Sequence, residues 1–542
     1  MKLATVAEMR AIEQEADANG LSYAQMMGNA GHGLADEIQL LVYSEDDERE
    51  ALGLVGPGNN GGDTLVALTH LAADGWRARA YLVRRKPESD ALVERLKKEG
   101  GEIILAESDA NFDKLSAFVS TADVILDGVL GTGFQLPLKV EIARVLAAVN
   151  QAVAELSWPP HVVAVDCPSG VDSDTGEAAE DAIPASVTVC MAAIKPGLLK
   201  FPAFELAGEL RVVDIGLTDE VKSWKKIKHA VADEEIVEDI LPLRPADAHK
   251  GTFGTALIAA GSINYTGAPL LAGKAAYRIG AGLVQMAVPS PVQITLAGHF
   301  PEATWIMLPQ EMGVIAGTAA DVLQKNFGRA TALLIGPGFG TEDATKEFIV
   351  NLLMGKSSPK KSAGRIGFVH SEGDTKEETN AGIPPLVVDA DGLRLLAKID
   401  GWAKLLPADT ILTPHPGEMA ALTGLEKDAI QADRLATALK SAKEWGHVVV
   451  LKGAFTVIAA PDGRATLIPV ATPALARAGT GDVLAGLIVG LRAQGVEAYE
   501  AAVAGAWVHA QAGLYAAEKV GAEASVMAGD VLDAVADVLS GF

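Results

Sequence analysis

The sequence predicts two fused α/β domains, each built on a mainly parallel sheet. Short apolar, β-branched runs alternate with helical stretches, which is the pattern of a doubly wound sheet. The runs are continuously apolar, as strands buried on both faces should be. A chain of 542 residues that is 49% hydrophobic is also expected to divide into two or three domains. We therefore expect a Rossmann-like, doubly wound N-terminal domain followed by a second α/β domain.

Composition excludes several partners. Lys and Arg number 45 against 70 Asp and Glu, a net charge of −25, which disfavours binding to nucleic acid or to anionic membranes. The two cysteines, Cys167 and Cys190, lie in apolar, strand-like contexts and are expected to be reduced, buried thiols. The first twenty residues lack an apolar signal-peptide core, and no run is long enough to span a membrane. We expect a cytoplasmic protein.

The predicted elements begin with a helix that Thr5 and Glu8 cap and that Gly20 ends. Strands and helices then alternate to about residue 216. The predicted strands of this half are 51–55, 78–83, 102–105, 123–126, 162–165, 186–191 and 210–213.

The pattern breaks between residues 217 and 250, a charged stretch with prolines and no strand-like run before Phe253. We place the boundary there and predict domains 1–228 and 229–542. The polar, glycine-rich segment 355–382 is expected to be a disordered insert or a lid. The predicted strands of the second half are 255–259, 283–288, 331–335, 386–388, 410–412, 448–451 and 456–459.

Polar residues follow three strands of the first half. Ligands bind outside the carboxyl ends of strands in open α/β sheets, and there stand the loop 56–63, Asp127 and Asp166. A single strand-end Asp is often only a helix cap, but two beside a glycine loop favour a site. The loop matches GxGxxG, yet the next strand ends in Arg84-Arg85-Lys86 rather than in an acid, which disfavours a standard NAD site. Its Asn-Asn-Gly-Gly-Asp portion suits a phosphate or an oxygen-bound metal ion.

The second half carries a helix N-terminus suited to phosphoryl transfer. Gly479-Thr480-Gly481-Asp482 frees backbone amides to face an anion, and Asp482 can take a proton from an attacking hydroxyl. The alternative is that Asp482 only complements the helix dipole; the other polar loops at the same sheet edge favour chemistry. His415, between two prolines, is expected to contact ligand, although a lone His is usually structural. Neither a Walker A sequence nor zinc-ligand spacing is found.

Together these motifs resemble the bifunctional NAD(P)H-hydrate repair enzymes. The resemblance covers nearly the whole chain. It implies an N-terminal NAD(P)HX epimerase and a C-terminal, ribokinase-like, ADP-dependent (6S)-NAD(P)HX dehydratase. The chain departs from the usual family residues at Thr64, Gly28 and Gly392. The segments that carry the resemblance are 59–63, 131–134, 166–176, 195–197, 249–251, 336–338, 389–391, 413–418, 452–456 and 479–482.

The resemblance implies specific site residues in each half. A potassium ion is implied at Asn60, Asp127 and Ser169 in the epimerase. Hydrate contacts there are implied at Asn59, Asn60, Gly61, Gly62, Asp63, Gly131, Thr132, Gly133, Phe134, Gln135, Leu136, Pro137 and Asp166. In the dehydratase, hydrate contacts are implied at Ala268, Gly338, His415 and Asp482, and nucleotide contacts at Lys452, Gly453, Ala454, Phe455, Thr456 and Gly481.

Roles follow from these positions. Asp482 is the expected base while ADP, with Mg²⁺, phosphorylates the C6 hydroxyl of the hydrate. Asp166 is the expected acid–base group of the epimerase because it ends a strand facing the loop 59–63, with Lys195 as a helper. The resemblance also implies a homo-oligomer. Two alternatives remain: a ribokinase-type small-molecule kinase with an N-terminal regulatory module, and a non-catalytic N-terminal binding scaffold.

Overall fold

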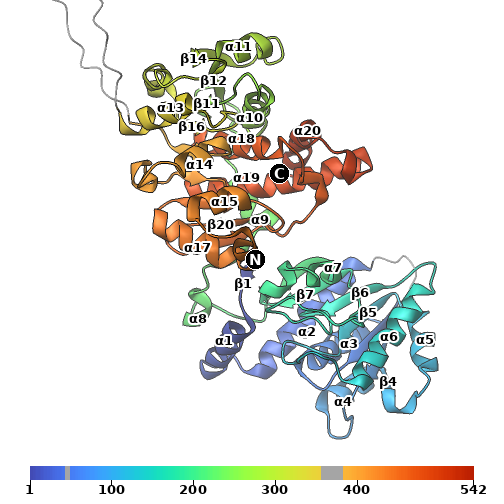
Figure 1. The fold of residues 1–542 in the computed structure, drawn as a ribbon. Coiled ribbons are helices and arrows are strands. Elements are labelled where there is room, and N and C mark those ends of the chain that lie inside the picture. Colours follow the sequence, from blue (N-terminus) through green and yellow to red (C-terminus); the bar gives the residue numbers. More distant parts are fainter. Residues whose placement is uncertain (43–48, 356–381) are drawn as a thin grey trace, which may run out of the picture. The chain divides into compact units, whose positions relative to one another are not determined.

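The computed structural model describes residues 1–42, 49–355 and 382–542. The predicted insert at 355–382 lies almost entirely outside the described residues. The chain forms two compact units, Met1–Val231 and Ala232–Phe542, drawn in blue to green and in green to red in Figure 1. Among the described residues, no helix has both the length and the apolar character needed to cross a bilayer.

Unit 1 is a doubly wound sheet, as predicted. Its seven strands pair in the order β4-β3-β2-β5-β6-β7-β9, and every pair is parallel. The strands are β2 (Glu50–Val55), β3 (Arg77–Leu82), β4 (Glu102–Leu105), β5 (Val124–Gly128), β6 (His161–Val165), β7 (Val187–Met191) and β9 (Glu209–Val213). The helices are α1 (Val6–Ala18), α2 (Tyr23–Leu41), α3 (Asn59–Ala73), α4 (Ala91–Lys98), α5 (Asp113–Val119), α6 (Val140–Ala154), α7 (Ala203–Ala207) and α8 (Lys222–Lys225).

Helices cover both faces of this sheet, which explains why its strands are apolar without alternation. Ala51 and Val55 of β2 belong to the core beneath α2 and α3. Leu52 and Leu54 of the same strand belong to a separate core beneath α5 and α6. The opening helix α1 carries the predicted capping box, in which Thr5 and Glu8 bond reciprocally.

The prediction that the charged stretch 217–250 contains no strand before Phe253 is wrong, because a short strand lies within it. His229–Val231 forms β10, and it pairs with β1 (Lys2–Leu3), which in turn pairs with β8 (Ala193–Ile194). Strands of two or three residues leave too short an apolar run for periodicity to show.

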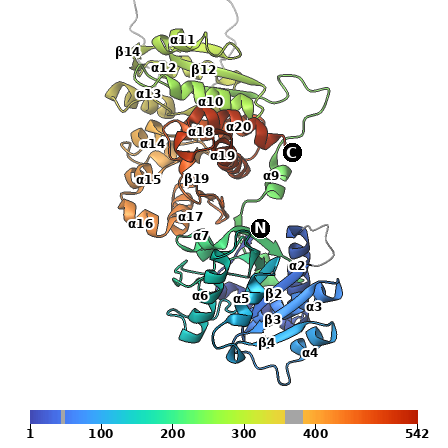
Figure 2. The same cartoon turned by 90° about the vertical axis from the view of Figure 1, so that its right-hand side faces the viewer.

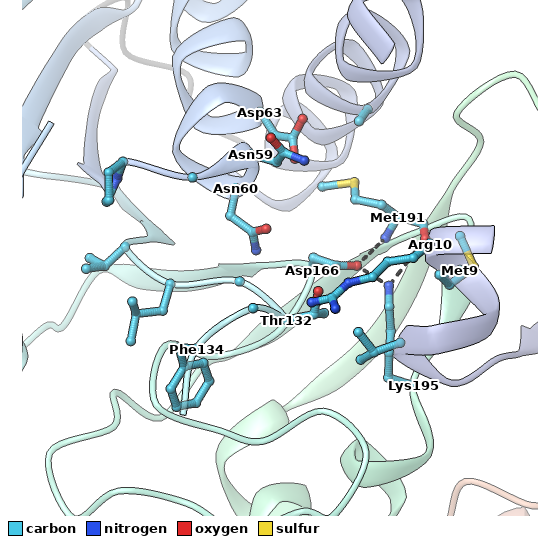
Figure 3. A pocket seen from close by; sticks show the side chains of 18 of the residues that line it. Met9, Arg10, Asn59, Asn60, Asp63, Thr132, Phe134, Asp166, Met191 and Lys195 are labelled. Carbon is cyan, nitrogen blue, oxygen red and sulfur yellow. Dashed lines mark hydrogen bonds and ion pairs between the residues drawn. The ribbon is translucent and has the colours of Figure 1, made fainter. Parts of the chain in front are cut away.

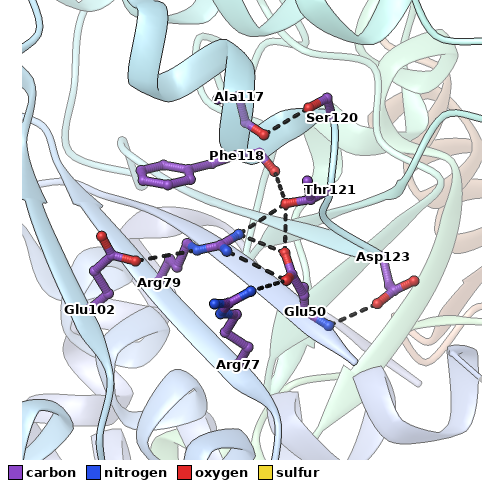
Figure 4. A network of polar contacts seen from close by, with 9 residues as sticks. All are labelled: Glu50, Arg77, Arg79, Glu102, Ala117, Phe118, Ser120, Thr121 and Asp123. Atoms are coloured by element: carbon purple, nitrogen blue, oxygen red, sulfur yellow. Dashed lines mark hydrogen bonds and ion pairs between the residues drawn. The ribbon is translucent and has the colours of Figure 1, made fainter. Parts of the chain in front are cut away.

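A polar network closes the amino-terminal ends of β2 and β3 (Figure 4). Arg79, whose side chain is 9% exposed, donates to Glu50 at 2.6 Å and to Thr121 at 3.0 Å. Arg77 also donates to Glu50, at 2.8 Å, and the Glu50 amide donates to Asp123 at 2.8 Å. The network lies at the sheet edge opposite to the strand-end loops that the sequence singled out.

Nine strands of unit 2 pair in the order β13-β12-β11-β16-β17-β18-β19-β20-β21. The first seven run parallel, and β20 and β21 are antiparallel additions. The strands are β11 (Thr255–Ala259), β12 (Leu283–Pro289), β13 (Thr304–Leu308), β16 (Ala332–Ile335), β17 (Leu386–Val388), β18 (Ile411–Leu412), β19 (Val448–Leu451), β20 (Val457–Ala459) and β21 (Ala465–Leu467), with a separate hairpin of β14 (Gln310–Glu311) and β15 (Val314–Ile315).

The helices of unit 2 again form two layers (Figure 2). Ile258 of β11 lies in a core with α10, α18, α19 and α20, whereas Leu257 faces a core with α12, α13 and α14. The Ala-rich stretch 501–517 lies in α19, which is largely buried. The helices are α9 (Glu234–Ile240), α10 (Gly267–Arg278), α11 (Ser290–Leu296), α12 (Ala319–Gln324), α13 (Asp343–Met354), α14 (Asp391–Leu396), α15 (Pro416–Thr423), α16 (Lys427–Ala432), α17 (Arg434–Trp445), α18 (Thr480–Ala493), α19 (Ala498–Val520) and α20 (Ala528–Leu539).

Each sheet reverses its strand order once. In unit 1 the chain order runs outward in both directions from the β2/β5 pair, and in unit 2 from β11/β16. Loops diverge at such a point and leave a crevice at the carboxyl ends of the strands. The strand-end residues singled out in the sequence therefore gather at these two edges.

Candidate active sites

The carboxyl ends of β2, β5 and β6 frame a cavity of about 1230 Å³ in unit 1 (Figure 3). The loop after β2 runs directly into α3, whose first turn holds Asn59 and Asn60. Of the residues predicted to contact hydrate in this half, the cavity is lined by Asn59, Asn60, Asp63, Gly131, Thr132, Gly133, Phe134, Gln135, Leu136, Pro137 and Asp166; Lys195 lines it too.

Gly61 and Gly62 are instead packed into the protein. A Cβ on Gly61 would lie 2.1 Å from the Gly56 carbonyl oxygen, and one on Gly62 would lie 2.7 Å from Met27. These glycines let the helix start pack against the preceding loop. Their place in the motif reflects close packing rather than a cavity-lining surface.

Arg85 explains why a basic residue ends the strand after the glycine loop. Its guanidinium donates to the carbonyls of Gly56 and Gly58 at 3.1 and 3.3 Å and pairs with Asp90 at 2.8 Å. The Arg85 guanidinium thus binds the backbone of the glycine loop 56–63. The dinucleotide-binding fingerprint has an acidic residue at the end of this strand instead.

Asp166 and Lys195 form a buried ion pair on the cavity floor, with exposed fractions of 8% and 2%. Asp166 also accepts the backbone amide of Met191 at 2.9 Å. Burial opposes the charge on Lys195, yet the Asp166 carboxylate raises the pKa of the ammonium above its usual range. Asp166 has a φ of 66°, a left-handed conformation that Asp tolerates better than most residues.

Asp63 faces the same cavity from the first turns of α3 (Figure 3). Burial raises the pKa of this carboxyl well above its usual value, and the nearby charges of Asp166 and Glu13 raise it further, against the opposing effect of Lys195. The site therefore places a carboxyl of raised pKa beside a carboxylate that is paired with a lysine, an arrangement suited to acid–base chemistry.

Asp127 and Ser169 form a buried hydrogen-bonded pair, and Asn60 lies on the cavity wall against the loop that follows β5. Asp127 is fully buried, and it accepts the Ser169 hydroxyl at 2.5 Å and the Ser169 amide at 2.7 Å. A Cβ on Gly131 would lie 2.1 Å from Asn60 Oδ1, so that amide oxygen lies against the loop 131–137. Burial raises the pKa of the Asp127 carboxyl, and the hydrogen bonds from Ser169 and Val129 oppose this rise.

The cavity also has walls that the sequence reasoning missed. Helix α1 contributes Met9, Arg10 and Glu13, and other elements contribute Arg84 and Lys139. The side-chain pattern of α1 is that of an ordinary amphipathic helix, and α1 precedes the strands whose ends were searched. Only the three-dimensional arrangement brings it to the carboxyl edge of the sheet.

The corresponding edge of unit 2 also holds a carboxylate–lysine pair. Asp389, which is 1% exposed, follows β17 and accepts from Thr413 and from Lys452, each at 2.6 Å. Burial opposes the ammonium, but Asp389 and Glu418 raise the pKa of Lys452. Thr413 follows β18 and Lys452 follows β19, so three neighbouring strand ends meet at one carboxylate.

The imidazole of His415 makes its polar contacts with the first turn of the helix that follows it. Its Nδ1 accepts the amides of Gly417 and Glu418 at 2.9 and 3.3 Å and so caps α15. Its Nε2 lies 3.1 Å from Glu418 Oε1. Both ring nitrogens therefore have protein partners, and a ligand would meet the face or edge of the ring.

Asp482 lies in the first turn of α18, beside the Asp389–Lys452 pair. Its pKa is raised to about 7, first by burial and next by the charge of Asp389; Asp391 and Glu418 add smaller rises, and Lys452 opposes them. Gly479 has a φ of 93°, and a Cβ on Gly481 would come within 3.5 Å of Lys452 Nζ. The helix N-terminus, the ammonium and the acid therefore face one small volume.

The remaining predicted contacts of unit 2 also lie at this edge. A Cβ on Gly338, whose φ is 64°, would lie 3.1 Å from Ala268 and 2.8 Å from Tyr265, so Gly338 and Ala268 are neighbours. The segment Lys452–Thr456 is a compact turn, in which Thr456 donates to the Gly453 carbonyl at 2.9 Å and accepts its amide at 3.3 Å. Phe455 is buried at 7% exposure, whereas Gly453 and Ala454 are exposed.

Two α/β units, each with a buried carboxylate–lysine pair and an acid of raised pKa at a strand-end crevice, define a two-site enzyme. Residues 256–536 match the family described as NAD(P)H-hydrate dehydratase, and residues 23–197 match the family described as YjeF-related protein N-terminus. The chain belongs to the bifunctional NAD(P)H-hydrate repair enzymes.

Relatives with this name align along almost the whole chain. The relative from Moorella thermoacetica is 36% identical over 99% of this chain and 97% of its own. The relative from Salinibacter ruber is 36% identical over 95% of this chain and 92% of its own. A solved ADP/ATP-dependent NAD(P)H-hydrate dehydratase from Bacillus subtilis is 28% identical and covers 58% of this chain and 98% of its own, with a TM-score of 0.45. Full-length similarity to repair enzymes confirms the predicted family and does not favour the kinase alternative.

Proposed function

We propose that unit 1 epimerises the C6 hydroxyl of NADHX and NADPHX, and that unit 2 dehydrates the S epimer to NADH or NADPH with ADP. The observation that carries the proposal is the repeated arrangement of a buried carboxylate–lysine pair beside an acid whose pKa is raised. Proton transfer at neutral pH is most efficient for groups with a pKa near the working pH, and Asp482 has a pKa of about 7.

In unit 2, Asp482 is the base. The C6 hydroxyl attacks the β-phosphorus of ADP, its proton passes to Asp482, and AMP leaves. The freed amides at the start of α18 and the ammonium of Lys452 stabilise the charge on the phosphoryl oxygens. The ring nitrogen lone pair then expels phosphate from C6, and loss of a C5 proton restores the dihydropyridine.

The nucleotide is expected on the turn Lys452–Thr456 and near Gly481. Gly453 and Ala454 are exposed, which leaves their backbone accessible to a ligand. Mg²⁺ usually binds one or two carboxylates and completes its shell with phosphate oxygens and water. Within the described residues, no group of three or more His, Cys, Asp or Glu side chains could hold a metal ion. We therefore assign most of the magnesium ligands to the phosphates of the nucleotide. The magnesium ion would neutralise part of the phosphate charge.

In unit 1, the floor and rim of the cavity suit the two ends of the substrate. Asp166 and Lys195 lie on the floor, where the hydroxylated ring would react. The cations Arg10, Arg84 and Lys139 also line the cavity and suit the phosphates of the dinucleotide, although the chain as a whole is strongly acidic. Asp166 is the acid–base group, and Lys195 holds and orients it.

Potassium fits Asn60, Asp127 and Ser169. Asp127 and Ser169 bring a carboxylate and a hydroxyl oxygen together, and the Asn60 amide oxygen lies against the loop 131–137 that follows Asp127. Asp127 is fully buried without an ion pair to any Lys or Arg of the described chain. A buried carboxylate of this kind is stabilised by a cation. The ion would brace the loop 131–137 through Asn60, and Asp127→Asn is expected to abolish any dependence of epimerisation on potassium.

The proposal is tested with the intact chain and a mixture of R and S NADHX, with ADP, Mg²⁺ and K⁺ present. Complete recovery of the near-ultraviolet absorbance of NADH, with release of inorganic phosphate, is expected. Asp166→Ala should leave the R epimer unrepaired while the S epimer is consumed, and Asp482→Asn should stop all recovery but still bind nucleotide. A stable phosphorylated product in place of inorganic phosphate would contradict dehydration. The resemblance also favours a cytoplasmic homo-oligomer, which sedimentation of the intact chain would test.

A further inference from the structure

Glu13 is a carboxyl of the unit 1 cavity that neither the sequence motifs nor the family resemblance assigns. It lies on α1 and lines the cavity with Met9 and Arg10 of the same helix. Its side chain is half-buried. Throughout residues 1–42, 49–355 and 382–542, no residue forms a hydrogen bond or ion pair with the Glu13 carboxyl, so its oxygens are free to meet a ligand.

Three carboxyls share the cavity with a single buried ammonium. Lys195 pairs with Asp166, which leaves Glu13 and Asp63 without a cation of their own on the floor. Burial raises the pKa of Glu13, the charge of Asp166 raises it further, and Lys195 and Arg10 oppose these effects. Asp63 faces the same group of charges. The cavity thus holds two carboxyls whose pKa is raised, next to the carboxylate that pairs with Lys195.

Epimerisation at C6 needs this combination. The hydroxylated carbon is bonded to the ring nitrogen, so the C6–O bond can break as the nitrogen lone pair forms an N1=C6 double bond. The departing oxygen needs a proton, and the water that adds to the other face of C6 must lose one. A single carboxylate already paired to Lys195 supplies only one of these two roles.

We propose that Glu13 is a second catalytic acid–base group of the epimerase, working opposite Asp166; this rests on the proposed epimerase function of unit 1. Protonated Glu13 gives its proton to the hydroxyl, which leaves as water, and Asp166 takes a proton from the water that adds to the opposite face. In the reverse direction the two carboxyls exchange roles. Atoms balance, because one water leaves and one enters, and proton exchange with solvent resets the pair.

Glu13 suits this role better than Asp63. Asp63 is 6% exposed and fixed in the first turns of α3, whereas Glu13 is half-buried on a neighbouring helix. A group that regains its proton from solvent at each turnover needs a path to water. Glu13 also has the longer side chain, which lets it follow the oxygen as it leaves the ring.

The test compares Glu13→Gln with Glu8→Gln in the intact chain. Glu8 lies on the same helix, and Gln can replace it in the capping box. Glu13→Gln should lower turnover of the R epimer by about 100-fold or more, the usual contribution of a general acid, while consumption of the S epimer in unit 2 stays unchanged and reports folded protein. Glu8→Gln should epimerise at the wild-type rate.

Two further readouts separate catalysis from a structural role. The wild-type pH profile should be bell-shaped, since one carboxyl must be protonated and the other ionised, with Asp63, Asp166, Lys195 and Arg10 the charged neighbours that set its limbs. Glu13→Gln should remove one limb, and Glu13→Asp should restore it in part. In heavy-oxygen water, wild-type epimerisation should place the label on the C6 hydroxyl at the rate of turnover.

Specific results would overturn the assignment. Wild-type epimerisation by Glu13→Gln would do so, as would a fall in rate with both limbs of the pH profile intact. Epimerisation without incorporation of heavy oxygen would show that the C6–O bond stays whole. If Asp63→Asn loses turnover and Glu13→Gln does not, Asp63 is the donor. Asp166→Ala distinguishes the role of Glu13 from the proposed function of unit 1. If Asp166→Ala still epimerises the hydrate, the proposed function itself is refuted. If Asp166→Ala is inactive and Glu13→Gln is active, only the role of Glu13 is refuted.

Discussion

Replacing Asp482 with Asn should stabilise unit 2, and the gain should grow with pH. Asp482 has a pKa of about 7 in the folded chain against an ordinary value of 3.8, so the folded state holds the proton more tightly than the unfolded state. The stability that protonated Asp482 supports is complete below pH 3.8 and is lost as pH rises to about 7.

The magnitude follows from the shift. A rise from 3.8 to about 7 is about 3 pKa units, and at 1.36 kcal/mol per unit the ionised side chain costs about 4 kcal/mol. Part of that cost is already present at pH 5, so Asp482→Asn should gain about 3 kcal/mol more at pH 8 than at pH 5. For a domain of this size, that corresponds to roughly 6 °C in the midpoint of thermal unfolding.

Thermal unfolding of the wild-type chain and of Asp482→Asn, followed at pH 5 and pH 8 without nucleotide, measures this difference. Asp247→Asn, at an exposed loop carboxyl, serves as the control and should show no pH-dependent gain. Equal effects of Asp482→Asn at both pH values would refute the reasoning, because they would mean that Asp482 is ionised at no cost. A gain in stability with loss of turnover would show that the acid is kept for chemistry.

Three other changes give sharp expectations. Lys195→Ala leaves the buried Asp166 without its cation, and unit 1 should lose about 3–5 kcal/mol of stability in denaturant titration; an unchanged midpoint would contradict a buried, charged pair. Arg79→Ala should destabilise unit 1 by about 3 kcal/mol while both activities persist in the folded protein, since its network (Figure 4) lies at the sheet edge away from the cavity. Gly61→Ala forces a Cβ to within 2.1 Å of the Gly56 carbonyl and should abolish epimerisation but not consumption of the S epimer; wild-type epimerisation would show that the loop has room to move.

The fold was largely predictable because its strands are buried on both faces. Residues 51–55 of β2 and all of β19 are uniformly apolar, and glycine-rich or charged residues follow each of them. The strands that escaped prediction were short or lay at an edge, such as β10 and β21, where pairing in three dimensions decides the conformation. Backbone hydrogen bonding across a distant pair leaves no periodic pattern in the sequence.

The candidate sites were predictable only where chemistry follows a strand. Asp166, Asp389 and Asp482 stand at strand ends or a helix start, so their positions in the chain already place them at the active edge. Glu13 has no such signal, because α1 comes before the sheet is begun. The sequence also suggested a ligand role for His415, but did not show that both its nitrogens would have partners in α15.

Backbone strain marks both sites and explains a further limit of sequence reasoning. Asp166 has a φ of 66° and Ala390, next to Asp389, has a φ of 51°, values that cost free energy for residues with a Cβ. Sequence patterns predict a left-handed backbone mainly at glycine, so they do not predict it at Asp166 or Ala390. At Asp166 the left-handed backbone accompanies a carboxylate that meets both Lys195 and the Met191 amide. At Ala390 it lets the chain turn from β17 into α14, so that Asp389 faces Lys452 while Asp391 accepts the Gly340 amide at 2.9 Å. In unit 1 the left-handed backbone lies at the lysine-binding carboxylate itself, and in unit 2 it lies at the residue that follows that carboxylate. The contacts of each carboxylate hold the chain in this conformation.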